Sequence, residues 1–394
     1  MKKMFIKALS VMLCVFTAAS LCMTAFAADE EGREPLHFDK SGKFRILQVT
    51  DTHLTDKYLE DTLRLIGAAC DREKPDLIAL TGDIAMDGGK EQVTACIDGL
   101  MNVFQTRNIP VAVTFGNHDS EANIFAREEL MAIYNSYPCS ISVDDGEALT
   151  GCGTYLLPIL SSDKKETAFN IWVFDSGDYD DEGHYANVAE DQVEWYKTKS
   201  IESERQNGKK INSIVFQHII VPQIYDAMTK SKVWLPGSYK GIYRDEYYRL
   251  SPKYNKHRGV LEEYPCPGYY DHGQFDAALE RGDVLGMFFG HDHTNSFEVN
   301  YKGIDLVASP ATRFRADDAL YESGMGYRII DLNEKDTSKY ETRCVYWYDF
   351  FTLADAAEMI KNKDSSGLKL LSTIESAGIL RKIFNVLMWV IELL

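Results

Sequence analysis

Two histidines separated by one residue lie in Gly290-His291-Asp292-His293, directly after the apolar run 284–289. The run is short, uncharged and bounded by glycine, which predicts a buried strand. In an extended chain, residues i and i+2 point the same way, so both imidazoles can reach one ion. Neutral imidazole is the commonest metal ligand in proteins. The pair therefore indicates metal binding, although a lone pair of this kind is more often a coincidence of the surface.

Four earlier segments also end an apolar, strand-like run with an aspartate, asparagine or histidine. With the histidine pair, they give seven candidate metal ligands: Asp51, His53, Asp83, Asn117, His218, His291 and His293. Oxygen and imidazole donors without thiolate suit Zn, Mn or Fe and disfavour a structural zinc site. Two ions that share a bridging carboxylate would use all the donors. Taken singly, Asp83 and Asn117 also fit helix caps, and His218 fits a core histidine.

A pair of bound cations would decide the chemistry of this cluster. Two divalent ions outweigh the negative charges of Asp51, Asp83 and a bridging hydroxide, so the site would be a local positive centre. A phosphate ester needs such a centre in order to bind an otherwise acidic chain. Two metals also activate water and stabilise both the attacking and the leaving oxygen of an in-line displacement. The residue types therefore indicate phosphoester hydrolysis.

The candidate ligands require a scaffold that brings several strand ends together. Apolar runs with β-branched and aromatic residues predict strands over 44–50, 76–80, 111–115, 211–216 and 284–289. Helices are expected over 58–73, 91–105, 122–135, 188–203 and 274–281. This alternation favours an α/β domain with a largely parallel sheet, where ligands bind at the carboxyl ends of the strands.

A second sheet is expected from the remaining strand-like segments. Residues 153–157 and 170–174 predict a hairpin, and antiparallel strands are expected over 296–299, 304–307, 326–331 and 342–347. The acidic segment 175–183 predicts a solvated loop near the pocket rim. The tyrosine-rich segment 221–272 lacks a clear periodicity, and we interpret it as a source of substrate contacts. An insertion that only covers the sheet edge is the alternative.

The first 27 residues fit a Sec-type signal peptide. Lys2 and Lys3 precede an apolar stretch, and Ala25-Phe26-Ala27 has the small residues expected before a cleavage site. We therefore expect export to the periplasm, the cell surface or the extracellular space. Residues 365–394 predict an apolar C-terminal helix, and its part 378–394 is too short to span a bilayer. That part suits contact with a membrane surface, or packing on the domain or on a second copy.

Charge and cysteine usage narrow the partners and the redox state. The formal net charge is −18, and loss of residues 1–27 would remove three lysines and no acid. Because such a surface repels polyanions, nucleic acid polymers are not expected partners. After residue 27, six cysteines remain, an even number that permits disulfides in an exported protein. A bridge between Cys139 and Cys152 is favoured, since it closes a short loop.

The ordered motifs resemble those of the calcineurin-like metallophosphoesterase superfamily. They are Asp51-Thr52-His53, Gly82-Asp83, Gly116-Asn117-His118-Asp119, His218 and Gly290-His291-Asp292-His293. Residues 173–179 and 290–293 most resemble the purple acid phosphatase-like branch. The resemblance covers residues 40–333. It implies a two-sheet sandwich flanked by helices (αββα) with mixed sheets, within a domain of residues 40–350.

The resemblance also implies a role for each residue. The first metal would be bound by Asp51, His53, Asp83 and His293, and the second by Asp83, Asn117, His218 and His291. His118 would face the leaving group as a general acid or as a stabiliser of transition-state charge, with Asp119 behind it. True purple acid phosphatases have a tyrosine where this chain has Met86. We therefore expect no tyrosinate-to-iron colour.

The expected function is an exported phosphoesterase with two divalent or mixed-valence metal ions. It would hydrolyse small phosphomonoesters by attack of a metal-activated hydroxide. The alternative within the superfamily is a phosphodiesterase that acts on nucleotides or lipid head groups. A non-catalytic metal-binding surface protein is the alternative outside the enzymes, and the complete ligand set together with His118 disfavours it.

Overall fold

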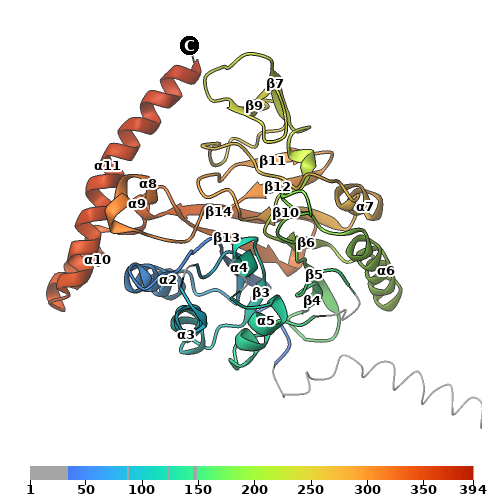
Figure 1. Ribbon diagram of the computed structural model, residues 1–394. Coiled ribbons are helices and arrows are strands. Elements are labelled where there is room, and N and C mark those ends of the chain that lie inside the picture. Colours follow the sequence, from blue (N-terminus) through green and yellow to red (C-terminus); the bar gives the residue numbers. More distant parts are fainter. Residues whose placement is uncertain (1–33, 87, 122–123, 145–148, 394) are drawn as a thin grey trace, which may run out of the picture.

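Short runs of β-branched and aromatic residues form the strands that carry the site. The computed structural model describes residues 34–86, 88–121, 124–144 and 149–393 (Figure 1), so the predicted signal peptide lies outside the described residues. Two mixed sheets pack face to face, and helices cover both outer faces. This is the predicted α/β sandwich.

The first sheet has five strands in the order β14-β13-β1-β2-β3. They are β1 (Lys43–Val49), β2 (Leu77–Thr81), β3 (Val111–Thr114), β13 (Gly326–Asn333) and β14 (Tyr340–Tyr346). The first three run parallel, whereas β13 is antiparallel to β1 and places Ile330 opposite Ile46. The expectation that 326–331 and 342–347 join the second sheet is therefore wrong. Apolar side chains of β13 are buried on both of its faces, and Ile330 enters the core between the sheets.

The second sheet has six strands in the order β11-β12-β10-β6-β5-β4. They are β4 (Tyr155–Leu160), β5 (Thr167–Val173), β6 (Ser213–Phe216), β10 (Val284–Phe289), β11 (Glu298–Tyr301) and β12 (Ile304–Ala308). The predicted hairpin is confirmed, because β4 and β5 pair antiparallel. Within the expected antiparallel run, β11 pairs antiparallel with β12 and β13 with β14, but the two pairs lie in different sheets, and β12 also lies parallel to β10.

Helices on both sides complete four layers. The first sheet is covered by α2 (Leu59–Glu73), α3 (Lys90–Gln105) and α5 (Arg127–Asn135), and the second by α6 (Glu190–Asn207) and α7 (Gln274–Arg281). The side chains of β1 alternate accordingly: Ile46 faces the second sheet, and Leu47 faces the helices. The helix expected from residue 122 begins at Arg127, because the Glu129 side chain accepts from the Ala126 N–H and caps it there.

The segment 221–272 is more regular than its sequence indicates. It forms a small sheet of β7 (Met228–Ser231), β9 (Tyr247–Leu250) and β8 (Tyr239–Lys240), in that order. Strands of two to four residues are too short to produce a readable alternation, which explains why the pattern misses them.

The C-terminal part of the chain is helical. It contains α8 (Ala319–Glu322), α9 (Trp347–Phe350), α10 (Leu353–Lys361) and α11 (Ser365–Leu393). Leu370 and Ile374 of α11 are buried in the core on the helix side of the first sheet, and the helix extends past α8 and α9 (Figure 1). Within the described part of the chain, we find no helix with the length and apolarity needed to cross a bilayer.

The cysteine prediction needs a correction. Cys152 is a buried free thiol, so the expected bridge between Cys139 and Cys152 is wrong. Burial, reinforced by the charge of Asp144, raises the pKa of the Cys152 thiol to about 12. A thiol that stays protonated at neutral pH is a packing residue rather than a reactive one.

Candidate metal centre

All seven candidate ligands follow the carboxyl ends of strands at one edge of the sandwich. Asp51 and His53 follow β1, Asp83 follows β2, and Asn117 follows β3. From the second sheet, His218 follows β6, and the histidine pair follows β10. The structure brings six of the seven together in two groups, as the alternation of strands and helices predicts, and Asn117 lies directly before His118, whose N–H donates to Asp83.

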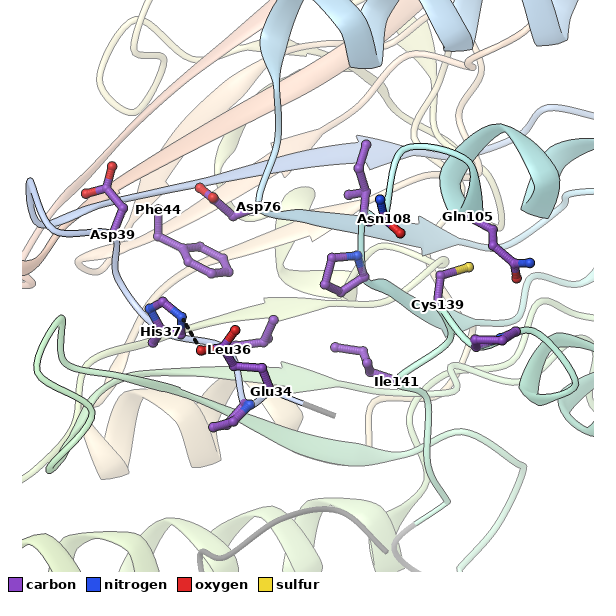
Figure 2. A pocket seen from close by; sticks show the side chains of 14 residues that line it. Glu34, Leu36, His37, Asp39, Phe44, Asp76, Gln105, Asn108, Cys139 and Ile141 are labelled. Atoms are coloured by element: carbon purple, nitrogen blue, oxygen red, sulfur yellow. Dashed lines mark ion pairs between the residues drawn. The ribbon is translucent and has the colours of Figure 1, made fainter. Parts of the chain in front are cut away.

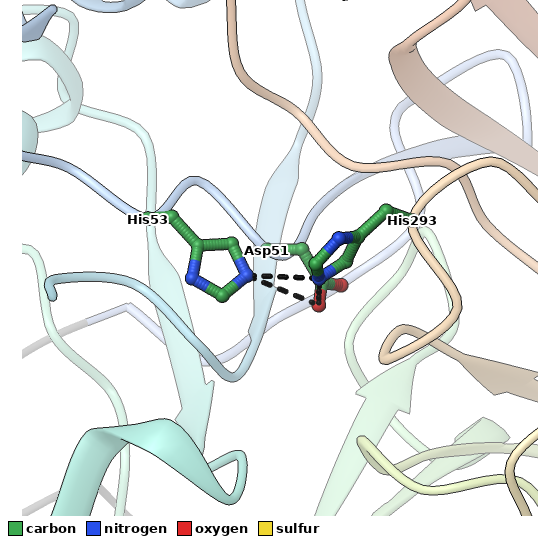
Figure 3. A group of neighbouring side chains, drawn as sticks. All are labelled: Asp51, His53 and His293. Carbon is green, nitrogen blue, oxygen red and sulfur yellow. Dashed lines mark hydrogen bonds and ion pairs between the residues drawn. The ribbon is translucent and has the colours of Figure 1, made fainter.

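One cluster consists of Asp51, His53 and His293 (Figure 3). The Nε2 atoms of the two histidines lie 3.0 Å apart. Asp51 Oδ1 lies 3.5 Å from His293 Nε2 and 3.8 Å from His53 Nε2. Three donor atoms from two different sheets therefore point at one spot, which is the arrangement that a bound cation requires.

A second cluster adjoins the first and consists of Asp83, His218 and His291. Asp83 Oδ2 lies 3.1 Å from His218 Nε2 and 3.9 Å from His53 Nε2, which belongs to the first cluster. This carboxylate oxygen therefore lies between the two groups. It is the atom best placed to contact two ions.

Several donor atoms at the centre are buried and make no hydrogen bond in the protein: Asp51 Oδ1, Asp83 Oδ2, Asn117 Oδ1, His218 Nε2 and His291 Nε2. Buried polar atoms are nearly always paired, because an unpaired one costs roughly 1–3 kcal/mol. Oxygen and imidazole donors of this kind fit divalent cations such as Mn, Zn or Fe. The residues present therefore fit the predicted pair of metal ions.

Each donor is oriented by bonds that its other atoms make. Asp51 Oδ2 accepts from Thr50 Oγ1 at 2.6 Å and from the His291 N–H at 3.0 Å. Asp83 Oδ1 accepts from the His118 N–H at 2.8 Å. These bonds turn the remaining carboxylate oxygens toward the centre.

His218 and Asn117 are also oriented by hydrogen bonds of their other polar atom. His218 Nδ1 lies 2.8 Å from the Thr81 carbonyl oxygen, which fixes the proton on Nδ1 and leaves Nε2 as a donor. Asn117 Nδ2 donates to the Tyr179 hydroxyl at 3.0 Å and leaves its amide oxygen for the centre. In His53, Nδ1 contacts the Met86 thioether, so Met86 lies behind the ring as a neighbour of the ligand.

The backbone at the centre is strained. Four ligands, Asp51, His53, Asp83 and His291, have φ values between 43° and 71°, in the left-handed region that non-glycine residues seldom adopt. Gly290 has to be glycine for a different reason: a Cβ there would lie 2.6 Å from Asp51 Oδ2. Strain of this kind persists where the surrounding structure enforces it, often at functional sites.

The electrostatics keep both carboxylates charged. Burial raises the pKa of the Asp51 carboxyl, but the His218 and His293 imidazoles outweigh this effect and hold the pKa below its usual value. The pKa of Asp83 is lowered in the same way, chiefly by His218. Two buried negative charges at the end of a sheet need positive partners, which divalent cations supply.

The two predicted catalytic residues differ in position. The His118 ring centre lies 5.5 Å from that of His53, at the edge of the first cluster. The Asp119 carboxylate instead accepts from the N–H groups of Asp83 (2.8 Å), Ile84 (3.0 Å) and Gly116 (2.8 Å). Asp119 therefore supports the Asp83 loop, and burial together with the charge of Asp83 raises the pKa of its carboxyl.

Tyrosines around the centre were missed from the sequence. The Tyr185 ring packs edge-on against His291, and Tyr179 holds Asn117. Tyr179 lies within the acidic segment 175–183, which predicts only a solvated loop, and Tyr185 lies two residues after it. The thiol of Cys266 also lies near His291 and Asp292. Aromatic residues within ten positions of the strand-end Asp175 are the signal that would have pointed to them.

A separate cavity of about 530 Å³ lies at the opposite end of the first sheet (Figure 2). It is lined by His37, Phe44, Asp76 and Pro110, which stand at or before the amino ends of β1, β2 and β3. In sheets of this kind, ligands bind at the carboxyl ends. The metal centre is therefore the stronger candidate for chemistry.

Comparisons with known proteins identify the family of this chain. The family model described as calcineurin-like phosphoesterase matches residues 44–295. "Probable inactive purple acid phosphatase 29" of Arabidopsis thaliana is 28% identical over 351 residues, which is 82% of this chain and 85% of that protein. "Phosphatase DCR2" of Saccharomyces cerevisiae is 26% identical over 294 residues, which is 68% of this chain and 47% of that protein. A dimetal phosphatase structure from Danio rerio aligns over 76% of this chain and 98% of its own, with 13% identity and a TM-score of 0.47.

Proposed function

Because the chain belongs to the calcineurin-like phosphoesterase family, we propose that it hydrolyses phosphomonoesters at a dinuclear metal site. The observation that carries this proposal is the convergence of buried donor atoms that make no hydrogen bond within the protein. Buried polar atoms are normally hydrogen-bonded within the protein. A cation site leaves them available.

The seven candidate ligands divide between the two ions. Asp51, His53 and His293 would hold one ion, Asn117, His218 and His291 the other, and Asp83 would contact both. When bound, Mn, Zn or Fe ions would supply a water of lowered pKa and neutralise charge on the phosphate oxygens. The protein contributes fixed donors at rigid strand ends, so little reorganisation is needed during the reaction.

His118 is the residue that we propose acts on the leaving group. Its backbone N–H is fixed by Asp83, and its ring lies beside His53. From this position, the imidazole can donate a proton or a hydrogen bond to the departing oxygen. Asp119 is a positioning residue for the Asp83 loop, because its carboxylate accepts from the Asp83 and Ile84 N–H groups.

Two other functions compete with this one. The first is a phosphodiesterase that acts on nucleotides or lipid head groups. The second is a non-catalytic metal-binding surface protein, and the relative named "Probable inactive purple acid phosphatase 29" favours its consideration. The donor set and His118 of this chain support an active centre instead.

The test uses purified protein that has been stripped of metal and reloaded separately with Mn, Zn or Fe. Hydrolysis of phenyl phosphate and of its matching diester is then compared. We expect a preference for the monoester, and a His118→Ala variant should lose rate while it retains its metal. A diester preference would favour the phosphodiesterase, and no turnover with any metal would favour the non-catalytic protein.

Export is a separate proposal that rests on the sequence of residues 1–27. We propose that the signal peptide is cleaved after Ala27 and that the mature protein acts outside the cytoplasmic membrane. N-terminal sequencing of the protein recovered from the non-cytoplasmic fractions should begin at Ala28. Recovery of the uncleaved chain from the cytoplasm alone would contradict it.

A further inference from the structure

We propose that a wall of four tyrosines beside the metal centre binds the leaving group of the substrate. The residues of this tyrosine wall are Tyr179, Tyr185, Tyr243 and Tyr269. The substrates preferred by the chain would be phosphate esters whose leaving group carries an uncharged planar ring. This inference rests on the proposed function, because it assigns a substrate class to the same site.

The wall begins at the metal centre itself. The ring centres of Tyr185 and His291 are 4.4 Å apart, with the planes at 85°. Tyr179 stacks on Tyr185 with ring centres 5.4 Å apart, and its hydroxyl accepts from Asn117 Nδ2. Two candidate ligands, His291 and Asn117, are therefore in direct contact with tyrosines. A group that leaves the phosphate on this side meets an aromatic surface.

The wall continues outward through the segment 221–272. The Tyr185 N–H donates to the Tyr243 hydroxyl at 3.0 Å, and the Tyr269 N–H donates to the Tyr185 carbonyl at 2.9 Å. The rings of Tyr243 and Tyr269 meet edge-on at 5.1 Å. His184 stacks on Tyr269 with ring centres 4.0 Å apart. These contacts connect the two segments and fix the rings relative to the centre.

The outer rings are exposed although they are apolar. Tyr243 is 42% exposed and Tyr269 is 45% exposed. Tyr243 also has a φ of 55°, which is costly for a bulky residue. Contiguous exposed aromatic surface and retained strain both mark binding sites. A planar ring is the ligand that gains the most binding energy on such a surface, because it can stack on the tyrosine rings.

Charge indicates which rings fit. Residues 178–185 contain Asp178, Asp180, Asp181 and Glu182 and no lysine or arginine. An anionic leaving group, such as one that carries further phosphates, would be repelled by these acids. A neutral aryl group would not. The wall therefore favours aryl monoesters over both polyphosphates and alkyl phosphates.

The experiment compares phenyl phosphate with butyl phosphate in the metal-loaded protein and in its Tyr243→Ala and Tyr269→Ala variants. For each substrate, kcat/KM of the wild type is divided by kcat/KM of the variant. This ratio cancels the intrinsic reactivity of the leaving group. We expect kcat/KM for phenyl phosphate to fall roughly 3- to 10-fold and that for butyl phosphate to fall less than about 2-fold. Tyr269→Phe should retain the phenyl preference, because it retains the ring.

Trp234→Ala is the matched control, since it removes another exposed aromatic side chain of the same segment. Equal losses on both substrates, or loss of the preference in Tyr269→Phe, would overturn the proposal. If the wild type turns over neither ester, the proposed function fails. The tyrosine wall is then tested separately, by comparing the affinities of the protein for phenylphosphonate and methylphosphonate. Tighter phenylphosphonate binding that Tyr269→Ala removes supports it, and equal affinities overturn it.

Discussion

Asp83 has a different task for each of its two carboxylate oxygens. One accepts from the His118 N–H, and the other faces the centre, 3.1 Å from His218 Nε2 and 3.9 Å from His53 Nε2. The second oxygen therefore lies between the two groups of candidate ligands, and both metal positions would depend on Asp83.

Asp83→Ala should therefore reduce the metal content from two ions per chain to less than one. The change removes the shared oxygen and the bond to His118, so turnover should fall at least ~100-fold with it. Elemental analysis after dialysis measures the metal, and Glu341→Ala, an exposed change on β14, is the control. Two retained ions in Asp83→Ala would mean that another residue bridges.

The loops after β2 and β3 act as one element because Asp119 connects them. Its carboxylate accepts N–H groups from Asp83 and Ile84 on one loop and from Gly116 on its own. The two loops carry Asp83 and Asn117, so their relative position decides whether both donors reach the centre. Asp119 thus holds the two ligand-bearing loops in their relative position.

Asp119→Ala should destabilise the fold by roughly 2–4 kcal/mol, because it leaves three buried N–H groups without their acceptor. Urea unfolding measures the loss. Asp119→Asn keeps an acceptor oxygen and should lose less. A normal unfolding midpoint in Asp119→Ala, combined with normal metal content, would contradict this role.

The sequence predicted where the strands that carry the site end, but it did not predict which strands pair with one another. Apolar runs that end in Asp, Asn or His located all five strand ends, since both signals are local. The pairing of β13 with β1 joins residues nearly 300 positions apart, and periodicity carries no information on such partners. The tyrosine wall was missed for the same reason: Tyr185, Tyr243 and Tyr269 meet only in the folded chain.

The exposed end of α11 is the element most open to a partner. Ile379, Ile383, Val386 and Leu387 are exposed at intervals that place them on one helix face. Deletion of residues 383–394 keeps the ion pairs of Arg381 with Glu262 and of Lys382 with Asp349. We expect the full-length protein to co-sediment with neutral lipid vesicles and the deletion to abolish this. The melting temperature should stay within about 2 °C of the full-length value. Loss of a dimer instead would assign the face to a second copy.

The site belongs to the molecule as a whole because neither sheet completes it. The first sheet supplies Asp51, His53, Asp83 and Asn117, and the second supplies the three remaining histidines. The Asp51 and Asp83 carboxylates are both buried where the two sheets meet, in a chain with a net charge of −18. Bound metal ions would therefore neutralise repulsion and connect the two sheets at once.

Chelation should consequently destabilise the entire sandwich and not only abolish turnover. A ligand at a hundredfold excess over its Kd stabilises the folded state by about 2.7 kcal/mol per site, so two ions should raise the melting temperature by several degrees. Calorimetry of the chelated and the Mn- or Zn-loaded protein measures this shift, and the shift should vanish in Asp83→Ala. If loading restored activity without moving the unfolding transition, metal binding would not be linked to unfolding of the sandwich, and the shared site inferred from the distances between Asp51, His53 and His293 would be wrong.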